Sequence, residues 1–391
     1  MPNRRPSIPV RVLFLIPDFS KGGAERFLID LCRALQNRPD VEFVIGTLSD
    51  GNQYPELTTN LPVIPLQYTP FSFAAPPEYA EYGRLLTDFR PQVVHTHLYL
   101  AEFLSAQHVS ERIAYVCHGH DNMVQFARPG MKTLFHRQGL TNWLEKRYLI
   151  RKKYSHARTS FIANSTHTRR YFQDVLPRFM RDDVHLLRCG FDYGRFRADA
   201  IRVPQAGETL RIVNVGSFQE KKNQILIVRI ADELRKAGVD FHVDLLGDGA
   251  LRGTVQEAVD RLGLQQHVSL HGNVDRVEEW LWRSHLYLHT AWYEPFGLVL
   301  LEAMAAGLPC VVLDGKGNRD LIEEGRNGFL IERQDPAAFA TRIRELAASP
   351  TLYQGVATYA QQYARDFDIG PAAERFLAFY RTRLAGMGRH G

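Results

Sequence analysis

The sequence has no hydrophobic run long enough to cross a bilayer and only four cysteines in 391 residues. The apolar segment nearest the N-terminus, residues 10–16, is short and is followed by Pro17, so it does not have the pattern of a signal peptide. The cysteines are far apart and show no metal-binding spacing, which is typical of reduced core residues. These absences argue against a membrane-spanning protein and a disulfide-stabilised secreted domain, and we expect a cytoplasmic protein.

What the chain does contain is enough apolar material for two hydrophobic cores. Hydrophobic residues make up 45% of the sequence, and a chain of this length usually forms more than one domain. Residues 199–208, which include Pro, Gln and Gly, form the best linker candidate. We therefore predict an N-terminal domain over residues 1–202, a C-terminal domain over residues 203–368 and a final helical segment over residues 369–391.

Short apolar runs alternate with helical patterns along the whole chain, which predicts an α/β protein with parallel, doubly wound sheets. The runs expected to be strands in the first domain are residues 10–16, 41–47, 63–65, 93–96, 113–117, 161–164 and 184–187. Those expected in the second domain are residues 210–215, a run ending at Leu246, and residues 268–271, 286–289 and 310–313.

Positive charge is concentrated in the first half of the chain. The net charge is +5, but residues 1–205 contain 27 Lys and Arg against 19 Asp and Glu. Residues 128–181 alone contain 13 basic residues and two acidic ones. Such a stretch favours an anionic partner, for example anionic lipid, a lipid-linked pyrophosphate or nucleic acid, and a solvated basic face without a partner is the alternative. Within it, residues 128–158 have a helical pattern with basic residues and scattered aromatic ones. Such a helix either lies on a membrane surface or packs on its own domain.

Polar residues follow several predicted strands of the first domain, at the edge where doubly wound sheets bind ligands. Gly22 and Gly23 lie on a strand-to-helix turn, where the backbone must come close to another group. His95 and His97 alternate on a strand and would point to the same face, so a metal pair has to be considered. No third ligand stands at a convincing spacing, and we expect no metal. His118 follows the apolar run that ends at residue 117.

The most informative stretch of the chain is residues 292–309, which reads as a polar loop followed by a short helix over residues 298–306. Its two glutamates, Glu294 and Glu302, are eight residues apart. Gly297 would free the backbone at the start of the helix, where N–H groups and the positive end of the dipole suit an anion. Both carboxylates could then reach hydroxyl groups of a phosphorylated polyol such as a nucleotide sugar.

Three further loops of the second domain follow predicted strands and are suited to holding a nucleotide. Residues 216–223 contain the neighbouring cations Lys221 and Lys222. Gly247 follows the strand that ends at residue 246, and Asn273 comes shortly after the strand over residues 268–271.

These residues resemble the retaining glycosyltransferases of family 4, whose signature is two glutamates around Pro-Phe-Gly and Glu-Ala-Met-Ala, as in residues 294–305. Residues 22–25, Gly-Gly-Ala-Glu, resemble the turn that opens the first domain in that family. The resemblance implies the GT-B fold, in which two Rossmann-like, doubly wound domains face each other across a cleft. It further implies an N-terminal acceptor domain, a C-terminal donor domain and a last helix that returns to the first domain.

The resemblance also implies roles for individual residues. Three are expected to act in catalysis: Glu294 on the sugar's 3- and 4-hydroxyls, His118 near its O6, and Lys222 on the donor phosphate. Glu302 is expected to bind the ribose. The full donor-binding set expected from the sequence is Gly22, Gly23, Ser217, Lys221, Lys222, Gly247, Asn273, Glu294, Pro295, Phe296, Gly297, Leu298 and Glu302.

Two positions depart from the family pattern. Cys189 stands where the family usually has Asn, which puts the hydrogen bonding of that turn in doubt. Ser217 stands where the family commonly has Arg, so one phosphate-neutralising charge is missing unless Lys221 supplies it.

We therefore expect a retaining, hexosyltransferase-type enzyme that uses a UDP-sugar rather than a GDP-sugar and needs neither a metal nor a cofactor. The expected acceptor is a glycolipid or polysaccharide precursor in bacterial surface-polysaccharide biosynthesis, such as that of lipopolysaccharide. If the basic residues 128–181 bind an anionic membrane surface, the enzyme would be peripheral at the inner face of the plasma membrane.

Other functions remain open at this point. One is a non-catalytic protein that binds a nucleotide sugar or a glycan, supported by Ser217 alone. Another is a nucleotide-sugar epimerase or a phosphorylase of the same fold, against which the paired glutamates and Lys222 argue. A nucleic-acid binder rests on charge alone and has no recognised motif, so we expect no nucleic-acid partner.

Overall fold

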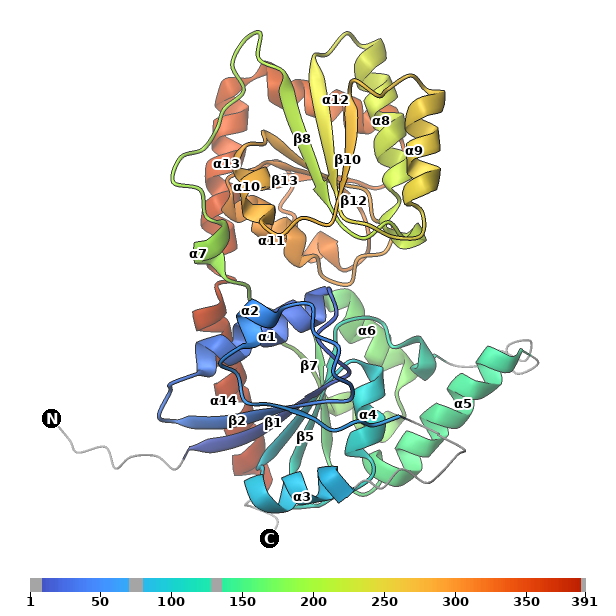
Figure 1. Ribbon diagram of the computed structural model, residues 1–391, viewed down its shortest axis with the longest axis vertical. Coiled ribbons are helices and arrows are strands. Elements are labelled where there is room, and N and C mark those ends of the chain that lie inside the picture. The colour runs from blue at the N-terminus through green and yellow to red at the C-terminus, as the bar shows by residue number, and fades with distance from the viewer. Residues whose placement is uncertain (1–8, 70–79, 128–135, 388–391) are drawn as a thin grey trace, which may run out of the picture. The chain divides into compact units, whose positions relative to one another are not determined.

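The computed structural model describes residues 9–69, 80–127 and 136–387, and these form two compact units. Unit 1 combines the chain up to Gly190 with the chain from Ile369 onward, and unit 2 is residues 191–368. In each unit helices cover both faces of one central sheet (Figure 1). This is the doubly wound arrangement that the alternating pattern predicts.

Within the described residues, the sheet of unit 1 has seven parallel strands in the order β3-β2-β1-β4-β5-β6-β7. The strands are β1 (Val10–Ile16), β2 (Val41–Thr47), β3 (Val63–Pro65), β4 (Val93–His97), β5 (Ala114–Gly119), β6 (Thr159–Ala163) and β7 (Val184–Leu186). The central strands are buried on both faces, which explains why they read as nearly continuous apolar runs.

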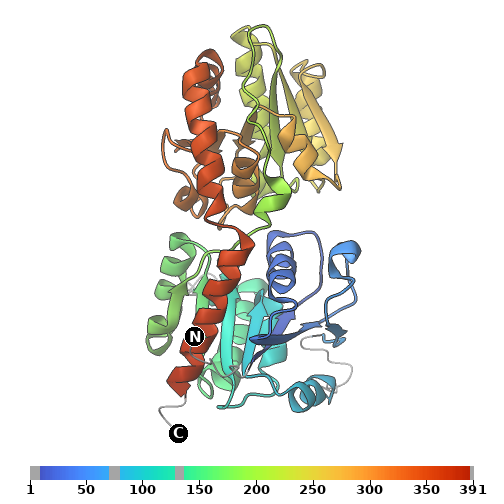
Figure 2. The same ribbon diagram turned by 90° about the vertical axis from the view of Figure 1, so that its left-hand side faces the viewer.

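The helices of unit 1 include a long one from the far end of the sequence. They are α1 (Gly23–Leu35), α2 (Pro55–Thr58), α3 (Ala80–Phe89), α4 (Tyr99–Ser105), α5 (Arg137–Leu149), which continues as the π-helical turn Ile150–Tyr154, α6 (Thr166–Val175) and α14 (Ile369–Met387). Helix α14 packs against α1 and β5 and lies along the sheet of unit 1 (Figure 2).

The sheet of unit 2 has six parallel strands in the order β10-β9-β8-β11-β12-β13. The strands are β8 (Leu210–Val215), β9 (Phe241–Leu246), β10 (Val268–Gly272), β11 (Leu286–His289), β12 (Cys310–Leu313) and β13 (Gly328–Ile331). The helices are α7 (Tyr193–Phe196), α8 (Gln224–Lys236), α9 (Arg252–Arg261), α10 (Val277–Trp282), α11 (Leu298–Ala305), α12 (Pro336–Ala348) and α13 (Pro350–Arg365).

The order of the strands reverses once in each sheet, between β1 and β4 in unit 1 and between β8 and β11 in unit 2. In doubly wound sheets the loops at the carboxyl ends of the strands diverge at this point and leave room for a ligand. The loops after β8 and β11 are therefore where a ligand of unit 2 is expected.

Every strand expected from the sequence is present, with ends displaced by at most two residues, and β13 is an addition. The predicted domain boundary at residue 202 is wrong by a short segment, because residues 191–202 pack on unit 2. The backbone N–H of Phe191 donates to the carbonyl of Phe367 (3.1 Å), and the Trp282 indole donates to the carbonyl of Phe196 (2.8 Å). These contacts, rather than the composition of the linker, fix the boundary at residue 190.

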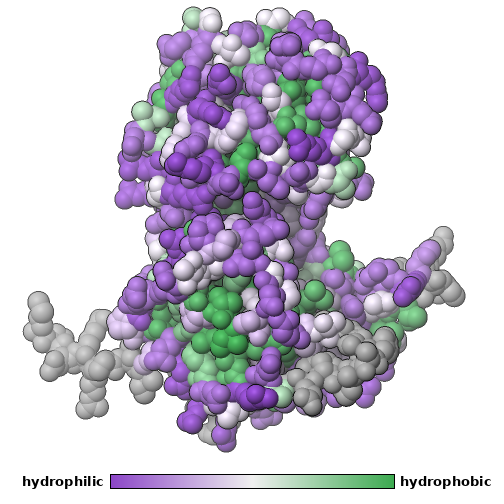
Figure 3. Space-filling model, viewed as in Figure 1, coloured by the Kyte–Doolittle hydropathy of each residue, from purple (hydrophilic) through white to green (hydrophobic). Residues whose placement is uncertain are grey.

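Hydropathy varies over the face of the molecule that Figure 3 shows. The viewed face of unit 2 is mainly hydrophilic, whereas a hydrophobic area lies on the viewed face of unit 1 (Figure 3). Among the described residues, no helix combines the length and the apolar character needed to cross a bilayer. All four cysteines are free and buried, as predicted.

A buried ion pair stabilises unit 1 between α4 and the turn after α5. The Lys153 ammonium lies 3.0 Å from the Glu102 carboxylate and donates to Ser105 Oγ at 2.7 Å, and both charged side chains are fully buried. The Tyr154 and Thr96 hydroxyls also donate to Glu102. Lys153 belongs to the predicted basic stretch, but this pairing removes it from the surface charge.

Replacing Lys153 by Met should destabilise the protein strongly, because the buried Glu102 carboxyl group would lose its ammonium partner. We expect a loss of about 3–5 kcal/mol in the free energy of unfolding, measured by urea denaturation. The neighbouring Lys152 is exposed, so Lys152→Met serves as the control and should change stability by less than about 0.5 kcal/mol. Similar stabilities of the two variants would contradict the ion pair.

Candidate active site

Two loops of unit 2 are joined where the strand order reverses. The short 3₁₀ turn Glu220–Lys222 follows β8, and the loop of residues 290–297 follows β11. The Thr290 hydroxyl donates to the carbonyl of Lys222 (3.1 Å), and the backbone N–H of Trp292 donates to the carbonyl of Lys221 (3.1 Å). These hydrogen bonds fix the two loops side by side at the carboxyl edge of the sheet.

The side chains of Lys222 and Glu294 meet between these loops. Lys222 Nζ lies 2.6 Å from Glu294 Oε2, and His289 Nε2 lies 3.3 Å from the same oxygen. Burial alone would raise the pKa of the Glu294 carboxyl, but the Lys222 ammonium and the His289 imidazole outweigh it and hold this pKa well below its usual range. Glu294 is therefore an ionised, buried acceptor beside a cation. The sequence analysis predicted Glu294 and Lys222 as site residues but missed His289. The position of His289 at the end of the predicted strand, residues 286–289, was a usable signal.

A third loop, residues 314–318 after β12, holds the backbone of Glu294. The Glu294 N–H donates to the carbonyl of Gly315 (2.7 Å), and the Gly317 N–H donates to the carbonyl of Glu294 (3.0 Å). A Cβ atom at Gly317 would lie 1.8 Å from the carbonyl oxygen of Pro295, so only glycine fits there. The sequence analysis did not identify this loop, although Gly-Lys-Gly one residue after a strand is a usable signal.

Helix α11 starts beside the ion pair. Gly297 precedes the helix with φ = 99°, a left-handed conformation that glycine adopts readily, and lets the chain turn from the loop into Leu298. Pro295 and Phe296 are buried under this turn, and Glu302 lies partly buried on the second turn of the helix. The first N–H groups of α11 therefore belong to the same site as Lys222 and Glu294.

The remaining predicted donor residues of unit 2 lie along the same sheet edge. Ser217 and Lys221 are partly buried in the loop after β8. Gly247, with φ = 127°, packs the end of β9 against that loop, because a Cβ atom there would lie 2.2 Å from the carbonyl oxygen of Gly216. Asn273 is exposed after β10, two strands away from β8, so it is the predicted residue farthest from the reversal point.

In unit 1 the predicted glycines lie at the start of α1, next to the reversal between β1 and β4. Gly22 is the N-cap, and a Cβ atom there would lie 2.3 Å from the Glu25 carboxylate. Burial raises the pKa of Glu25 to about 7, its backbone hydrogen bond partly opposes this, and the negative Asp18 adds to it. The tight turn therefore encloses a carboxyl group that titrates near neutral pH.

His118, predicted to be catalytic, belongs to β5 and is fully buried in unit 1. The structure gathers it with His95 and His97 of β4, with ring centroids 5.4 Å and 5.2 Å from that of His118. Its Nε2 atom lies 3.7 Å from Cys189 Sγ. His95 and His97 share one face of their strand, as predicted. His118 lies beside both rings, which the spacing of these residues in the sequence did not reveal.

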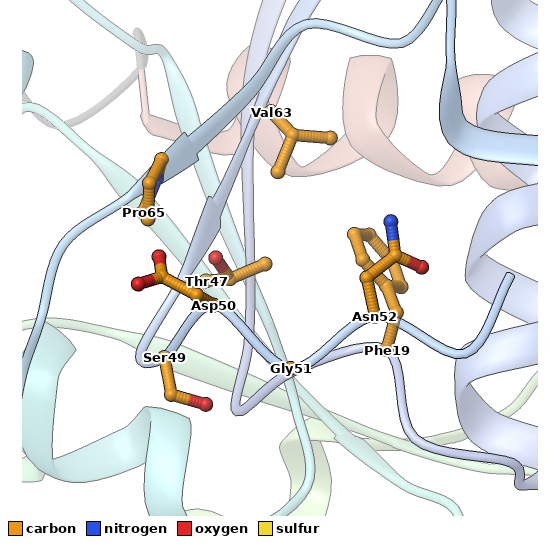
Figure 4. A pocket seen from close by; sticks show the side chains of 8 residues that line it. All are labelled: Phe19, Thr47, Ser49, Asp50, Gly51, Asn52, Val63 and Pro65. Carbon is orange, nitrogen blue, oxygen red and sulfur yellow. The ribbon is translucent and has the colours of Figure 1, made fainter. Parts of the chain in front are cut away.

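A small pocket lies on unit 1 at the carboxyl ends of β2 and β3, with a volume of about 120 Å³ (Figure 4). Its lining residues are Phe19, Thr47, Ser49, Asp50, Gly51, Asn52, Val63 and Pro65. Pockets that enclose drug-sized ligands usually measure about 300–1,000 Å³. The pocket is therefore too small to enclose a nucleotide sugar.

Comparison with known families identifies this arrangement. The two sheets, with paired loops at the reversal point of the second, are those of the GT-B class of glycosyltransferases, as the solved structures below also show. Residues 21–195 match the family model described as Glycosyltransferase Family 4, and residues 197–363 match that described as Glycosyl transferases group 1. The chain belongs to this family, which confirms the family and the fold predicted from the sequence.

Individual relatives support the same assignment at modest identity. EpsD of Bacillus subtilis is 29% identical over 163 residues, which is 42% of this chain and 43% of that protein. N-acetyl-alpha-D-glucosaminyl L-malate synthase of Bacillus anthracis is 27% identical over 312 residues, 76% of this chain and 75% of that protein. The crystal structure of Anabaena HepE in complex with UDP and glucose superimposes with a TM-score of 0.77 at 21% identity, covering 95% of this chain and all of that one.

The raised pKa of Glu25 predicts a pH-dependent stability. Between about pH 4.5 and pH 7 the folded protein holds a proton that the unfolded chain has lost, so the free energy of unfolding falls as pH rises through this window. In Glu25→Gln this loss should disappear. The difference in free energy of unfolding between the variant and wild type should therefore shift in favour of the variant by up to about 3 kcal/mol from pH 4 to pH 8. Denaturation at both pH values measures this difference.

Glu42→Gln, at an exposed position of β2, is the matched control and should follow wild type at both pH values. A parallel pH dependence of wild type and Glu25→Gln would show that Glu25 does not titrate near neutrality.

Proposed function

We propose that this protein transfers a sugar from a UDP-sugar to a hydroxyl group of a glycolipid or polysaccharide precursor, with retention at the anomeric carbon and without a catalytic metal. The observation that carries the proposal is the Lys222 and Glu294 pair, set at the start of α11 where the strand order of unit 2 reverses. A cation, the N-terminal N–H groups of a helix and an ionised hydroxyl acceptor in one place suit a sugar diphosphate.

Cleavage of the bond between sugar and diphosphate places negative charge on the leaving phosphate. Lys222 and the first N–H groups of α11 would stabilise that charge, because they are already oriented at the sheet edge before the reaction. In the structure Lys222 is paired with Glu294. Binding of the donor would give the ammonium a phosphate partner and release Glu294 to accept hydrogen bonds from sugar hydroxyls.

The two glutamates have separate roles in this proposal. Glu294 would bind the sugar ring, and Glu302, on the second turn of α11, would bind the ribose. Neither glutamate is assigned as a nucleophile, because the family resemblance implies that both bind hydroxyl groups of the donor. The leaving phosphate itself would take the proton of the attacking hydroxyl, and His118 would lie near the sugar's O6.

Uridine is favoured as the base by what is known of a similar protein. HepE, which shares the fold, has been solved with UDP and with glucose. We assign binding of the acceptor to unit 1. This unit contains Gly22, in the turn between β1 and α1, and His118, in β5.

A second candidate function is binding of a nucleotide sugar without turnover. Ser217 favours it, because this side chain is partly buried in the loop beside Lys222, at the position where the family commonly carries Arg. Whether Lys221 compensates for the missing charge stays a prediction.

We further propose that unit 1 attaches to the inner face of the plasma membrane, which makes the protein peripheral there. Of the predicted basic residues 128–181, those from 128 to 135 lie outside the described residues. On α5 and the turn after it, one stripe at helical spacing is exposed throughout: Arg137, Leu140, Leu144, Arg147 and Arg151. Leu140 and Leu144 are 44% and 52% exposed, an apolar pair between cations that suits an anionic lipid surface.

Transfer and mere binding are distinguished by incubating the protein with a panel of nucleotide sugars and measuring free sugar. A transferase should hydrolyse its donor slowly, and UDP-sugars should be used in preference to GDP-sugars. Glu302→Ala should weaken UDP binding about 5- to 150-fold in calorimetry, which corresponds to the loss of a charged hydrogen bond worth about 1–3 kcal/mol.

The control for the donor site is Glu257→Ala, which removes an exposed carboxylate from α9 of the same unit and should leave UDP affinity unchanged. UDP binding without release of sugar from any donor would favour the binding protein. If Glu302→Ala binds UDP as tightly as wild type, the ribose assignment is wrong.

The membrane proposal predicts salt-sensitive binding to vesicles. At low salt the protein should co-sediment with phosphatidylglycerol vesicles and not with phosphatidylcholine vesicles, and binding should weaken as salt rises. Changing Arg147, Arg151 and Lys152 together to Ser should reduce binding by about 1 kcal/mol per charge.

The control variant changes three exposed arginines of unit 2, Arg229, Arg261 and Arg344, to Ser, so that it loses the same charge elsewhere. Equal losses in the two variants, or equal recovery with both kinds of vesicle, would refute attachment through α5.

A further inference from the structure

His289 is a buried histidine of unit 2 to which the proposed transfer reaction gives no role. Side chains alternate along β11, and Leu286 and Leu288 belong to the hydrophobic core of unit 2. His289 lies on the opposite face with Tyr287, whose ring centroid is 6.1 Å away. As the last residue of β11, with 1% of its surface exposed, it stands where the strand passes into the loop that carries Glu294.

The imidazole of His289 lacks a hydrogen bond in this position. Neither of its ring nitrogens forms one with any of the described residues. Nε2 lies 3.3 Å from Glu294 Oε2, but the ring is not turned to donate to that oxygen, which Lys222 Nζ contacts at 2.6 Å. Buried polar atoms nearly always have a partner, and an apolar side chain would fill the same space without this cost. The unpaired ring points to a second state of the site in which it has a partner.

Glu294 is the partner that the surroundings leave for His289. The Tyr287 hydroxyl on the same face donates to the carbonyl of Val215 at 3.2 Å. Burial lowers the pKa of His289, and the neighbouring Glu294 opposes this only in part, so the ring is neutral at neutral pH and carries one N–H. With that N–H on Nε2, a small rotation of the ring lets His289 donate to the carboxylate.

We propose that His289 is a positioning residue of the sugar site, which holds the Glu294 carboxylate once Lys222 has turned to the donor diphosphate. This role rests on the proposed function, in which donor binding separates Lys222 from Glu294. Lys222 and His289 are the two side chains that the structure places against Glu294 Oε2, so the imidazole is left to hold it when the ammonium turns away. A buried carboxylate without either partner tends to take up a proton, and it then accepts hydrogen bonds from sugar hydroxyls less well.

His289 should therefore matter for the sugar and not for the nucleotide. With UDP alone, water can fill the sugar position and hydrate the Glu294 carboxylate in place of the imidazole. A bound sugar displaces that water, and the orientation of Glu294 then depends on His289. Loss of the ring should weaken binding of a UDP-sugar and leave binding of UDP nearly unchanged.

The test compares UDP with UDP-glucose and UDP-N-acetylglucosamine in calorimetry on the full-length protein. His289→Leu should weaken UDP-sugar binding about 10- to 100-fold, as expected for a lost hydrogen bond to a charged group, and UDP binding less than about 3-fold. His289→Gln, whose amide N–H reaches the position of Nε2, should bind the UDP-sugar within about 3-fold of wild type. His289→Asn, whose amide N–H reaches only the position of Nδ1, should behave like His289→Leu.

His285→Leu is the matched control. His285 is also fully buried and directly precedes β11, at the amino end of the strand. A strand rises about 3.3 Å per residue, which puts this residue about 13 Å from His289. The variant loses a buried imidazole at the other end of the same strand. Its melting temperature in circular dichroism should therefore fall, while the ratio of its UDP-sugar and UDP affinities stays that of wild type.

Unchanged UDP-sugar affinity in His289→Leu would overturn the positioning role. Equal losses of UDP and UDP-sugar affinity would overturn it as well, because they indicate a purely structural role, and so would equal affinities of His289→Gln and His289→Asn. A wild-type protein that binds UDP but neither UDP-sugar would refute the proposed function itself, together with this role. Normal binding by wild type with an unaffected His289→Leu refutes the role of His289 alone.

Discussion

The contact between Lys222 and Glu294 is the interaction on which the proposed donor site depends. It joins the loop after β8 to the loop after β11, on either side of the point where the strand order reverses. The charge of Glu294 is kept in a buried position because the ammonium and the neighbouring His289 outweigh the cost of burial. A pair of this kind loses much of its stabilisation when one partner is removed, so each residue constrains the other.

The backbone around this pair is held by hydrogen bonds within unit 2. The Glu294 N–H donates to the carbonyl of Gly315, the Glu294 carbonyl accepts from the N–H of Gly317, and the left-handed Gly297 turns the chain into α11. The site therefore needs little backbone reorganisation to present a cation, helix N–H groups and a carboxylate together. Preorganised groups of this kind are the most effective at stabilising charge that develops during a reaction.

The sequence was sufficient wherever the signal was local. Strand runs such as residues 210–215 and 286–289 were placed correctly because apolar periodicity within a few residues determines them. Glu294 and Lys222, which the structure brings together, were predicted from short motifs at strand ends. What could not be predicted depends on contacts between distant segments: the burial of Lys153 against Glu102, and the approach of His118 to the histidines of β4, follow only from strand order and register.

The most direct measurement is a crystal structure of the protein with bound UDP. The account predicts that the diphosphate lies against the loop after β8 and the first turn of α11, that Lys222 has turned from Glu294 to a phosphate oxygen, and that Glu302 accepts hydrogen bonds from the ribose. Nucleotide bound elsewhere, for example on unit 1 alone, with Lys222 still paired to Glu294, would contradict the assignment of unit 2 as the donor-binding half.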